Sequence, residues 1–296
     1  MEYKYDIEAD WILLSGCNFR CHYCYWSIES LSMRPPDLAE YEKVATFFDN
    51  SQLTWLLHIT GGEPFLISNF IRLCEALTRH HFISVNTNLS LDRINDFIKY
   101  ISPNRTSFIN CSIHIEERER RNKVDEFIQR VGLLEKAGFR TLASYVCYPN
   151  LLNRLQQDYD HFFEKGIVLI PKMLQGIHEG KEYPTAYTLE QRKIFLGVSL
   201  KAQSDWLELH KDNQEFPTIN MFKDRDFVLN GLPDYRGKMC NAGYKFVRIR
   251  ENGDIRRCGP ADTLGNIFTG EFQRRKGLSV CKEIECPYFC EKYVVK

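Results

Sequence analysis

Short apolar segments alternate with longer amphipathic segments over most of the first 170 residues. The amphipathic segments carry apolar residues at i, i+3, i+4 and i+7, and this spacing predicts helices; in Ser68–His80, Ser68 is a candidate N-cap. The apolar segments end at polar or turn-forming residues and predict buried strands. The predicted strands are 7–15, 53–60, 82–86, 107–115, 141–147 and 167–170, and the predicted helices are 38–50, 68–80, 91–101, 123–137 and 152–165.

The order of these elements indicates the fold class. Strands that alternate with helices predict an α/β fold with a parallel sheet and right-handed crossovers. In such folds the loops at the carboxyl ends of the strands carry the chemistry. Six strand–helix units are too few for a closed eight-unit barrel. After Pro171 the pattern changes to a loop-like stretch at 176–188, a helix at 189–210 and an irregular, charged bridge at 211–239.

Composition limits the function classes. The 296-residue chain has 39 basic and 39 acidic residues, so it has no net formal charge that would attract nucleic acid or an anionic membrane. No window has the length and hydropathy of a membrane span, and the charged stretch MEYKYDIEAD lacks the apolar core of a signal peptide. We therefore expect a cytoplasmic protein that has neither nucleic acid nor a membrane as a partner.

Eleven cysteines are many for a protein of a reducing compartment, where clustered thiols bind metal more often than they form disulfides. Cys17, Cys21 and Cys24 lie within SGCNFRCHYCYW, directly after the first predicted strand. Three thiolates on one loop can hold one inorganic cluster, and they leave one iron of a four-iron cubane without a protein ligand. A three-thiol zinc loop is the alternative. The isolated cysteines in apolar segments are Cys74, Cys111 and Cys147.

The second motif, TGGEP at 60–64, follows the second predicted strand. Gly61 and Gly62 allow the backbone to bend tightly and to approach a ligand without a Cβ in the way. The peptide groups at the strand end can hydrogen-bond a polar group, and we expect the carboxylate of Glu63 to face the pocket. An ordinary turn before Pro64 is the alternative.

Two weaker features follow the next strands. Thr87 and Asn88 come directly after the third predicted strand. Ser112 and His114 lie two residues apart on the fourth, so they share one face, and Cys111 then faces the helices. A hydrogen-bonded core histidine is the alternative for His114.

The third motif is a set of five cysteines in the last sixth of the chain. The segment 244–258, YKFVRIRENGDIRRC, predicts a β-hairpin that turns at 251–254 and brings Cys240 and Cys258 together. Cys281, Cys286 and Cys290 converge on a short tail. Five cysteines supply the four ligands of one cluster and leave one spare. A zinc knuckle is the alternative.

The C-x3-C-x2-C loop and the GGEP strand end together resemble the radical S-adenosylmethionine (SAM) superfamily. The resemblance implies an open partial (β/α)6 TIM-like barrel at 1–200 and a bridging region at 201–239. The pattern CX12GX4C resembles the SPASM and twitch modules of that superfamily, which implies a small cysteine-rich auxiliary-cluster domain at 240–296. Two departures are the presence of Leu89 where the family often has the glycine of Thr-Asn-Gly, and five cysteines where a twitch module has four and a SPASM module seven.

The resemblance also implies roles for residues. It implies that one [4Fe–4S] cluster is bound by Cys17, Cys21 and Cys24, and that an auxiliary [4Fe–4S] cluster is bound by four of Cys240, Cys258, Cys281, Cys286 and Cys290. It implies that SAM is held by Tyr23, Gly61, Gly62, Glu63, Pro64, Asn88, Ser112 and His114, with Tyr23 near the adenine or capping the cluster.

Finally, the resemblance implies an oxidoreductase. A low-potential donor of the flavodoxin or ferredoxin type reduces the cluster, SAM is cleaved to methionine and a 5′-deoxyadenosyl radical, and the radical abstracts a hydrogen atom from substrate. The first hypothesis for the substrate is a peptide or protein side chain, and the second is a sugar or aminocyclitol that is dehydrogenated or epimerised. The third hypothesis is a non-catalytic iron–sulfur scaffold or sensor. Candidate substrate contacts are Lys172, Gln175, His178, Glu179, Lys181, Glu116 and Arg118, and Cys147 is either a hydrogen-atom donor or a buried thiol.

Overall fold

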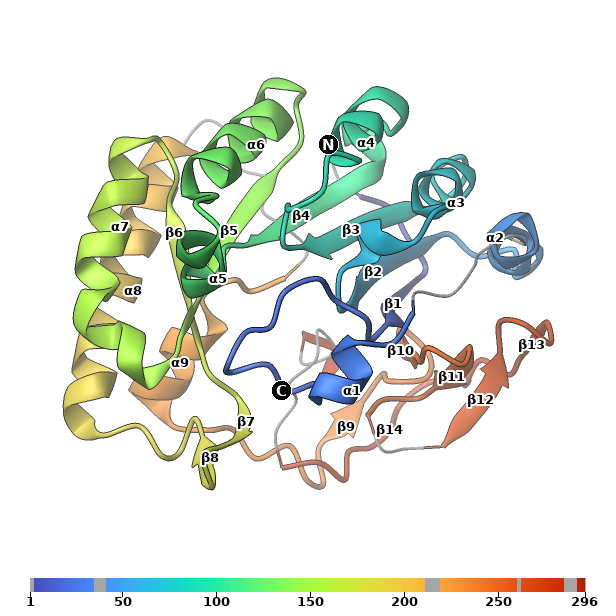
Figure 1. Cartoon of the computed structure of the whole chain (residues 1–296). Helices are drawn as coiled ribbons and strands as arrows, with labels where there is room; N and C mark the ends of the chain where they lie inside the picture. Colours follow the sequence, from blue (N-terminus) through green and yellow to red (C-terminus); the bar gives the residue numbers. More distant parts are fainter. Residues whose placement is uncertain (1–2, 35–40, 211–218, 260–261, 285–291, 296) are drawn as a thin grey trace.

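A ten-stranded sheet with the order β13-β12-β11-β10-β1-β2-β3-β4-β5-β6 forms the frame of the molecule (Figure 1). The computed structural model describes residues 3–34, 41–210, 219–259, 262–284 and 292–295. Six strands lie in chain order and run parallel to one another: β1 (Ile7–Leu14), β2 (Trp55–Gly61), β3 (Phe82–Thr87), β4 (Thr106–Ser112), β5 (Thr141–Cys147) and β6 (Leu169–Met173). The structure is therefore a mixed α/β fold with a parallel sheet, as the alternating pattern predicts.

Helices cover the outer side of the curved sheet, and the loop that follows β1 lies on the opposite side (Figure 1). The helices between and after the parallel strands are α2 (Tyr41–Asn50), α3 (Phe70–Leu77), α4 (Ile94–Tyr100), α6 (Val124–Lys136), α7 (Leu155–Glu164) and α8 (Leu189–Leu209). Shorter helical turns are α1 (Ile28–Leu31), η1 (Pro64–Leu66), η2 (Pro103–Arg105), α5 (Ile115–Arg120) and η3 (Pro149–Arg154).

The two faces of the sheet differ in polarity. On β1, Ile7, Ala9 and Trp11 belong to the main hydrophobic core. Glu8 and Asp10, which alternate with them, are buried on the other face. There the Glu8 carboxylate lies 3.5 Å from the imidazole of His58 on β2. The face under the helices is therefore apolar, and the opposite face carries polar side chains that can bind a ligand.

Local sequence predicted the strands better than the helix starts. The predicted strand 107–115 ends at Ser112, because His114 has a left-handed backbone (φ 47°) that starts α5, a helix that the pattern missed. The prediction of Ser68 as an N-cap was wrong, since α3 starts at Phe70 after Asn69, which makes no side-chain cap. The first residues of the predicted helix 38–50, residues 38–40, lie outside the described part of the chain.

Segments predicted as irregular contain regular structure. The stretch 176–188 includes a two-stranded ribbon of β7 (Gly176–His178) and β8 (Lys181–Tyr183). The bridge contains α9 (Lys223–Asn230). That helix is short and charged, so its apolar periodicity does not stand out in the sequence.

The C-terminal hairpin joins the main sheet. As predicted, β10 (Phe246–Ile249) and β11 (Asp254–Arg256) pair antiparallel. The pairing of β10 with β1 in parallel, Glu8 opposite Phe246, was not predicted, because nothing local in either segment signals it. The remaining short strands are β9 (Met239–Cys240), β12 (Thr263–Asn266), β13 (Glu271–Phe272) and β14 (Ser279–Val280), with β14 paired to β9. Among the described residues, no helix combines the length and apolar character required to cross a membrane.

A buried histidine in the outer layer makes stability depend on pH. His81 is 2% exposed, and its imidazole lies 3.3 Å from the carboxylate of Asp49 and accepts from the N–H of Trp55. Burial lowers the pKa of His81 to about 4. The unfolded chain therefore binds a proton between pH 6.5 and 4 that the folded chain does not, and stability present above pH 6.5 is lost as the pH falls.

We expect the free energy of unfolding to fall by about 2 kcal/mol between pH 7 and pH 5 from His81 alone. In urea unfolding at the two pH values, His81→Gln should show a smaller difference than the wild-type protein by about that amount. Equal differences in the two proteins would contradict this assignment.

Candidate functional site

One cavity of about 800 Å³ lies at the carboxyl ends of the parallel strands. The loop after β1 contributes all three of its thiols, and β2 contributes Gly61 and Gly62 at its end. The polar residues from the ends of later strands that line it are Asn86, Asn88, Asn110, Ser112, His114, Ser144, Lys172 and Gln175. Two of the sequence motifs therefore meet at one cavity, at the position where parallel α/β folds carry their sites.

The three thiols of the loop face the cavity as a set. The loop is held at Cys17, whose N–H donates to the carbonyl of Leu31 (3.0 Å), and at Cys24, whose N–H donates to the carbonyl of Cys21 (3.1 Å). Burial raises the pKa of Cys17 to about 11 and also raises the pKa values of Cys21 and Cys24, so the thiols are protonated until a metal displaces the protons.

No three His, Cys, Asp or Glu side chains in the described ranges lie close enough to share a single metal ion. A cubane asks for a different arrangement, because each cysteine binds a different iron. Three soft thiol donors at the edge of a large cavity match the donor set of such a cluster.

The glycines of TGGEP allow the end of β2 to pack against the start of the cysteine loop. The N–H of Gly62 donates to the carbonyl of Leu14 (2.8 Å), and the N–H of Glu63 donates to the carbonyl of Gly16 (2.9 Å). A Cβ on Gly62 would lie 2.0 Å from the carbonyl oxygen of Gly16, and one on Gly61 would lie 2.1 Å from that of Leu14. The glycines thus permit close approach to neighbouring backbone, as well as lining the cavity.

The expectation that the Glu63 carboxylate faces the pocket was wrong. Glu63 is fully buried, and neither it nor Pro64 lines the cavity. Its oxygens accept from the hydroxyl of Thr87 (2.8 Å) and from the N–H groups of Asn88 (2.7 Å) and Phe65 (3.1 Å). Burial raises the pKa of Glu63 to about 7, against the effect of these donors. The side chain turned inward because the protein supplies three donors there, and it ties the end of β2 to the end of β3.

Leu89, which stands where a glycine was expected, adopts a glycine-like backbone. Its φ is 51°, and its side chain is 1% exposed. A left-handed backbone costs a non-glycine residue about 1–2 kcal/mol. The segment after β3 therefore keeps the conformation that the missing glycine would give, and burial of the leucine side chain offsets the strain.

Substitution at Leu89 should reverse the usual order of alanine and glycine. We expect Leu89→Ala to lower the free energy of unfolding by about 2–4 kcal/mol. Leu89→Gly should be no worse than Leu89→Ala, although glycine normally costs about 1 kcal/mol more, because glycine removes the strain. Urea unfolding of both variants measures this, with Leu134→Ala and Leu134→Gly in α6 as the pair expected to keep the normal order. A normal order at position 89 would contradict the assignment of strain.

An aromatic and imidazole pair forms one wall of the cavity. The Tyr23 hydroxyl lies 3.0 Å from Nδ1 of His114, and the Tyr23 ring packs 5.8 Å from that of Tyr148. Burial lowers the pKa of His114 to about 4, so the imidazole is neutral at neutral pH. Ser112 contacts Ser144 (3.3 Å between hydroxyl oxygens). His114 and Ser112 both line the cavity although His114 lies beyond the end of β4, whereas Cys111 is buried on the core side.

The structure separates the candidate substrate contacts. Lys172 and Gln175 line the cavity, whereas His178, Glu179, Lys181, Glu116 and Arg118 do not. Two contributions to the cavity were not predicted from the sequence. One is Lys292, and the other is α9, which lines the cavity with Lys223, Asp224, Asp226, Phe227 and Asn230. Cys147 is fully buried and does not line the cavity, which gives no support to a role as hydrogen-atom donor.

Three of the C-terminal cysteines come together. Cys240 and Cys258 lie with Ala242 in a small apolar cluster that is separate from the main core, and Cys281 packs against it. Cys281 directly follows β14, which pairs with β9, and this pairing brings Cys281 to the cluster. The N–H of Cys281 donates to the carbonyl of Lys238 (2.8 Å). Cys286 and Cys290 lie outside the described residues.

Comparison with known sequences gives a match to a family and a shorter match to a cyclase. Residues 11–161 match the profile of the family described as the radical SAM superfamily. A GTP 3′,8-cyclase from Haemophilus ducreyi is 36% identical over 78 residues, which is 24% of this chain and 23% of the cyclase. The chain thus matches less than a quarter of that relative.

Solved structures resemble the fold. Native anSMEcpe with bound AdoMet superposes with a TM-score of 0.61 at 19% identity, over 88% of this chain and 78% of that one. Streptococcus suis SuiB superposes with a TM-score of 0.56 at 18% identity, over 90% of this chain and 64% of that one. At these identities the likeness is one of fold.

Proposed function

The chain belongs to the radical SAM superfamily, and on that premise we propose that this enzyme abstracts a hydrogen atom from a peptide or protein substrate. One observation carries the proposal: the three loop thiols and the Gly61–Gly62 strand end line the same cavity. A scaffold or sensor that only holds a cluster does not need the Gly61–Gly62 strand end beside it.

The family uses a [4Fe–4S] cluster and SAM. When bound, these two supply a 5′-deoxyadenosyl radical at the cost of one electron from a low-potential donor of the flavodoxin or ferredoxin type. In the proposed site Cys17, Cys21 and Cys24 bind the cluster, and the peptide groups of Gly61 and Gly62 hold the amino group of SAM. The proposed contacts to the rest of SAM are Tyr23, Asn88, Ser112 and His114, all of which line the cavity. Phe19, Tyr23 and Trp26 also line the cavity, and in this proposal their rings exclude water from the cluster.

Support for a peptide substrate comes from the fold neighbours and the cavity. Native anSMEcpe has been solved with bound AdoMet and a Cp18Cys peptide, and SuiB with its precursor peptide SuiA. Here the cavity lining includes positive, negative and neutral polar side chains, among them Lys172, Asp226 and Gln175. Such a mixed lining suits backbone amides and polar side chains of a peptide.

We also propose an auxiliary [4Fe–4S] cluster on Cys240, Cys258 and Cys281, with a fourth ligand from Cys286 or Cys290. The grouping of the first three thiols supports it. In this proposal residues 1–200 form a partial (β/α)6 barrel, 201–239 a bridging region and 240–296 a SPASM- or twitch-like unit. That division follows the chemistry and not the sheet, since β10–β13 extend the barrel sheet. Abundant cysteines and a low-potential donor also favour a cytoplasmic location.

The experiment begins with anaerobic reconstitution and counting of iron per chain. About eight irons support two clusters, about four remove the auxiliary cluster, and stoichiometric zinc favours a zinc knuckle. The reduced protein is then incubated with SAM, and 5′-deoxyadenosine is measured. Intact clusters without 5′-deoxyadenosine would favour the scaffold over the enzyme.

Substrate class is tested with deuterium. Extract from cells grown in heavy water is divided into a peptide fraction and a small-molecule fraction, and each is given to the enzyme with SAM. We expect deuterium in 5′-deoxyadenosine from the peptide fraction. Deuterium from the small-molecule fraction alone would contradict the proposal and favour a sugar or aminocyclitol.

A further inference from the structure

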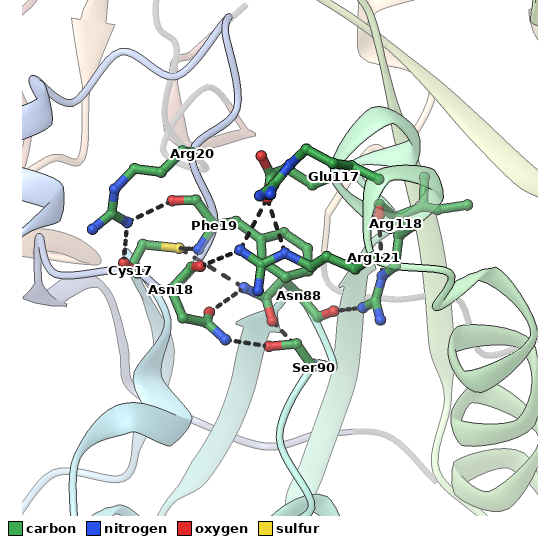
Figure 2. Close-up of polar contacts among 11 residues, drawn as sticks. Cys17, Asn18, Phe19, Arg20, Asn88, Ser90, Glu117, Arg118 and Arg121 are labelled. Carbon is green, nitrogen blue, oxygen red and sulfur yellow. Dashed lines mark hydrogen bonds and ion pairs between the residues drawn. The ribbon is translucent and has the colours of Figure 1, made fainter.

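Asn88 lies between two buried side chains, Glu63 and Arg118, and the cysteine loop; Figure 2 shows Asn88 with Arg118 and Cys17. Its N–H donates to the Glu63 carboxylate (2.7 Å), and its carbonyl accepts from the Arg118 guanidinium. Glu63 and Arg118 are both 0% exposed. The backbone of Asn88 is therefore held at its N–H and at its carbonyl by two buried side chains.

Arg118 is itself held in place. Its Nε donates to the carbonyl of Ile113 (3.3 Å). Its guanidinium lies over the rings of Phe19, at 5.3 Å, and Phe127, at 5.0 Å. Phe19 belongs to the cysteine loop, so this arginine connects the loop to the segment after β3. Arg118 was predicted as a substrate contact, but its complete burial assigns it to the support of the site.

The side chain of Asn88 points its amide nitrogen at the cysteine loop. The N–H of Ser90 donates to Oδ1 of Asn88 (3.0 Å), which settles the orientation of the amide. Nδ2 donates to Oδ1 of Asn18 (2.9 Å) and lies 3.8 Å from Sγ of Cys17, within reach of a sulfur acceptor. Figure 2 shows the contacts of the Asn88 amide to Asn18 and to the sulfur of Cys17.

The N–H of Phe19 also donates to the sulfur of Cys17, at 3.4 Å. Hydrogen bonds to a ligand sulfur withdraw charge from it and stabilise the more negative, reduced form of a cluster. A rigidly held, buried donor stabilises charge on the sulfur more effectively than a donor that water can replace.

We propose that Asn88 is a positioning residue for the cluster-binding loop that donates a hydrogen bond to the Cys17 sulfur and thereby raises the reduction potential of the cluster. The inference rests on the proposed function, because it needs a cluster bound at Cys17. It adds a role in electron uptake to a residue otherwise assigned to SAM.

The test is a potentiometric titration of the reconstituted protein without SAM, monitored by the electron paramagnetic resonance of the reduced cluster. Asn88→Asp keeps the shape of the side chain and removes the donor, and Asn88→Leu removes it without adding charge. We expect each variant to have about a tenfold lower ratio of reduced to oxidised cluster at a fixed potential, which is about 59 mV for one electron. Asn88→Asp should show the larger shift. Ser90→Ala is the control, because it removes only the acceptor of Asn18.

A potential unchanged in both variants would overturn the proposal. Loss of iron from both variants, with iron retained in Ser90→Ala, would also overturn it, since the residue would then have a structural role alone. Both readouts are independent of turnover. A wild-type protein that makes no 5′-deoxyadenosine would contradict the proposed function and leave the measured shift intact.

Discussion

Alanine in place of Gly62 is expected to remove the enzyme's activity and much of its cluster. The added Cβ would meet the carbonyl oxygens of Gly16 at 2.0 Å and Ser15 at 2.4 Å, and these are backbone atoms that no side-chain rotation can move. The two strand ends must separate, which breaks the bonds from Gly62 to Leu14 and from Glu63 to Gly16. A shift of the site by about 1 Å costs roughly a hundredfold in rate. We expect at least that loss of 5′-deoxyadenosine formation, and a free energy of unfolding lower by about 3 kcal/mol.

Gly132→Ala is the matched control for this prediction. Gly132 lies in α6, and a Cβ there would meet nothing within 4 Å. Alanine in a helix interior should raise the free energy of unfolding by up to about 1 kcal/mol and leave iron content unchanged. Wild-type iron content and activity in Gly62→Ala would show that the close approach of the two strand ends does not organise the site.

The second large effect is expected from single serine substitutions in the cysteine loop. Serine at Cys17, Cys21 or Cys24 leaves two thiols, which cannot hold three irons of a cubane. We expect each variant to lose the loop cluster and to make no detectable 5′-deoxyadenosine. Iron per chain should fall to the share bound by the C-terminal cysteines. Iron analysis and product chromatography on anaerobic protein measure both quantities.

Cys147→Ala is the control, because it removes a thiol that is not a proposed cluster ligand. Its sulfur is buried and lies 3.8 Å from the carbonyl of Tyr145. We expect wild-type iron content and 5′-deoxyadenosine formation, with a modest loss of stability from the small cavity. Loss of the cluster in this variant would show that cluster loss is not specific to the three loop cysteines.

Features set by neighbouring residues were predictable, and features set by distant ones were not. The strands follow from apolar runs, and the meeting of the cysteine loop with Gly61 and Gly62 follows from the rule that parallel strands end at one edge. The inward turn of Glu63 did not follow, because it depends on donors that Thr87 and Asn88 supply from the next strand. Charge alone suggests a surface or a pocket for such a residue.

The same limit explains Arg118 and Leu89. Arg118 is a charged residue in a charged helix, and only the three-dimensional packing of Phe19 and Phe127 explains its burial. Leu89 was recognised as a departure from the family pattern, but a sequence does not reveal that the backbone keeps the left-handed conformation without glycine. Leu89 lies in the segment after β3, and Arg118 reaches that segment from α5 by donating to the carbonyl of Asn88. The support of the site therefore comes from contacts between residues that are distant along the chain.

The pairing of β1 with β10 has a consequence for how the protein is made. Glu8 lies opposite Leu56 of β2 on one side and opposite Phe246 of β10 on the other, so β1 gains its second neighbouring strand only after β10 has been synthesised. Until then one of its edges presents unpaired amides and carbonyls to other nascent chains. Pairing over so long a separation is also slow, since the chain entropy of the intervening loop must be lost before the contact forms. During synthesis we therefore expect β1 to be the strand most open to pairing with other chains until β10 has been made.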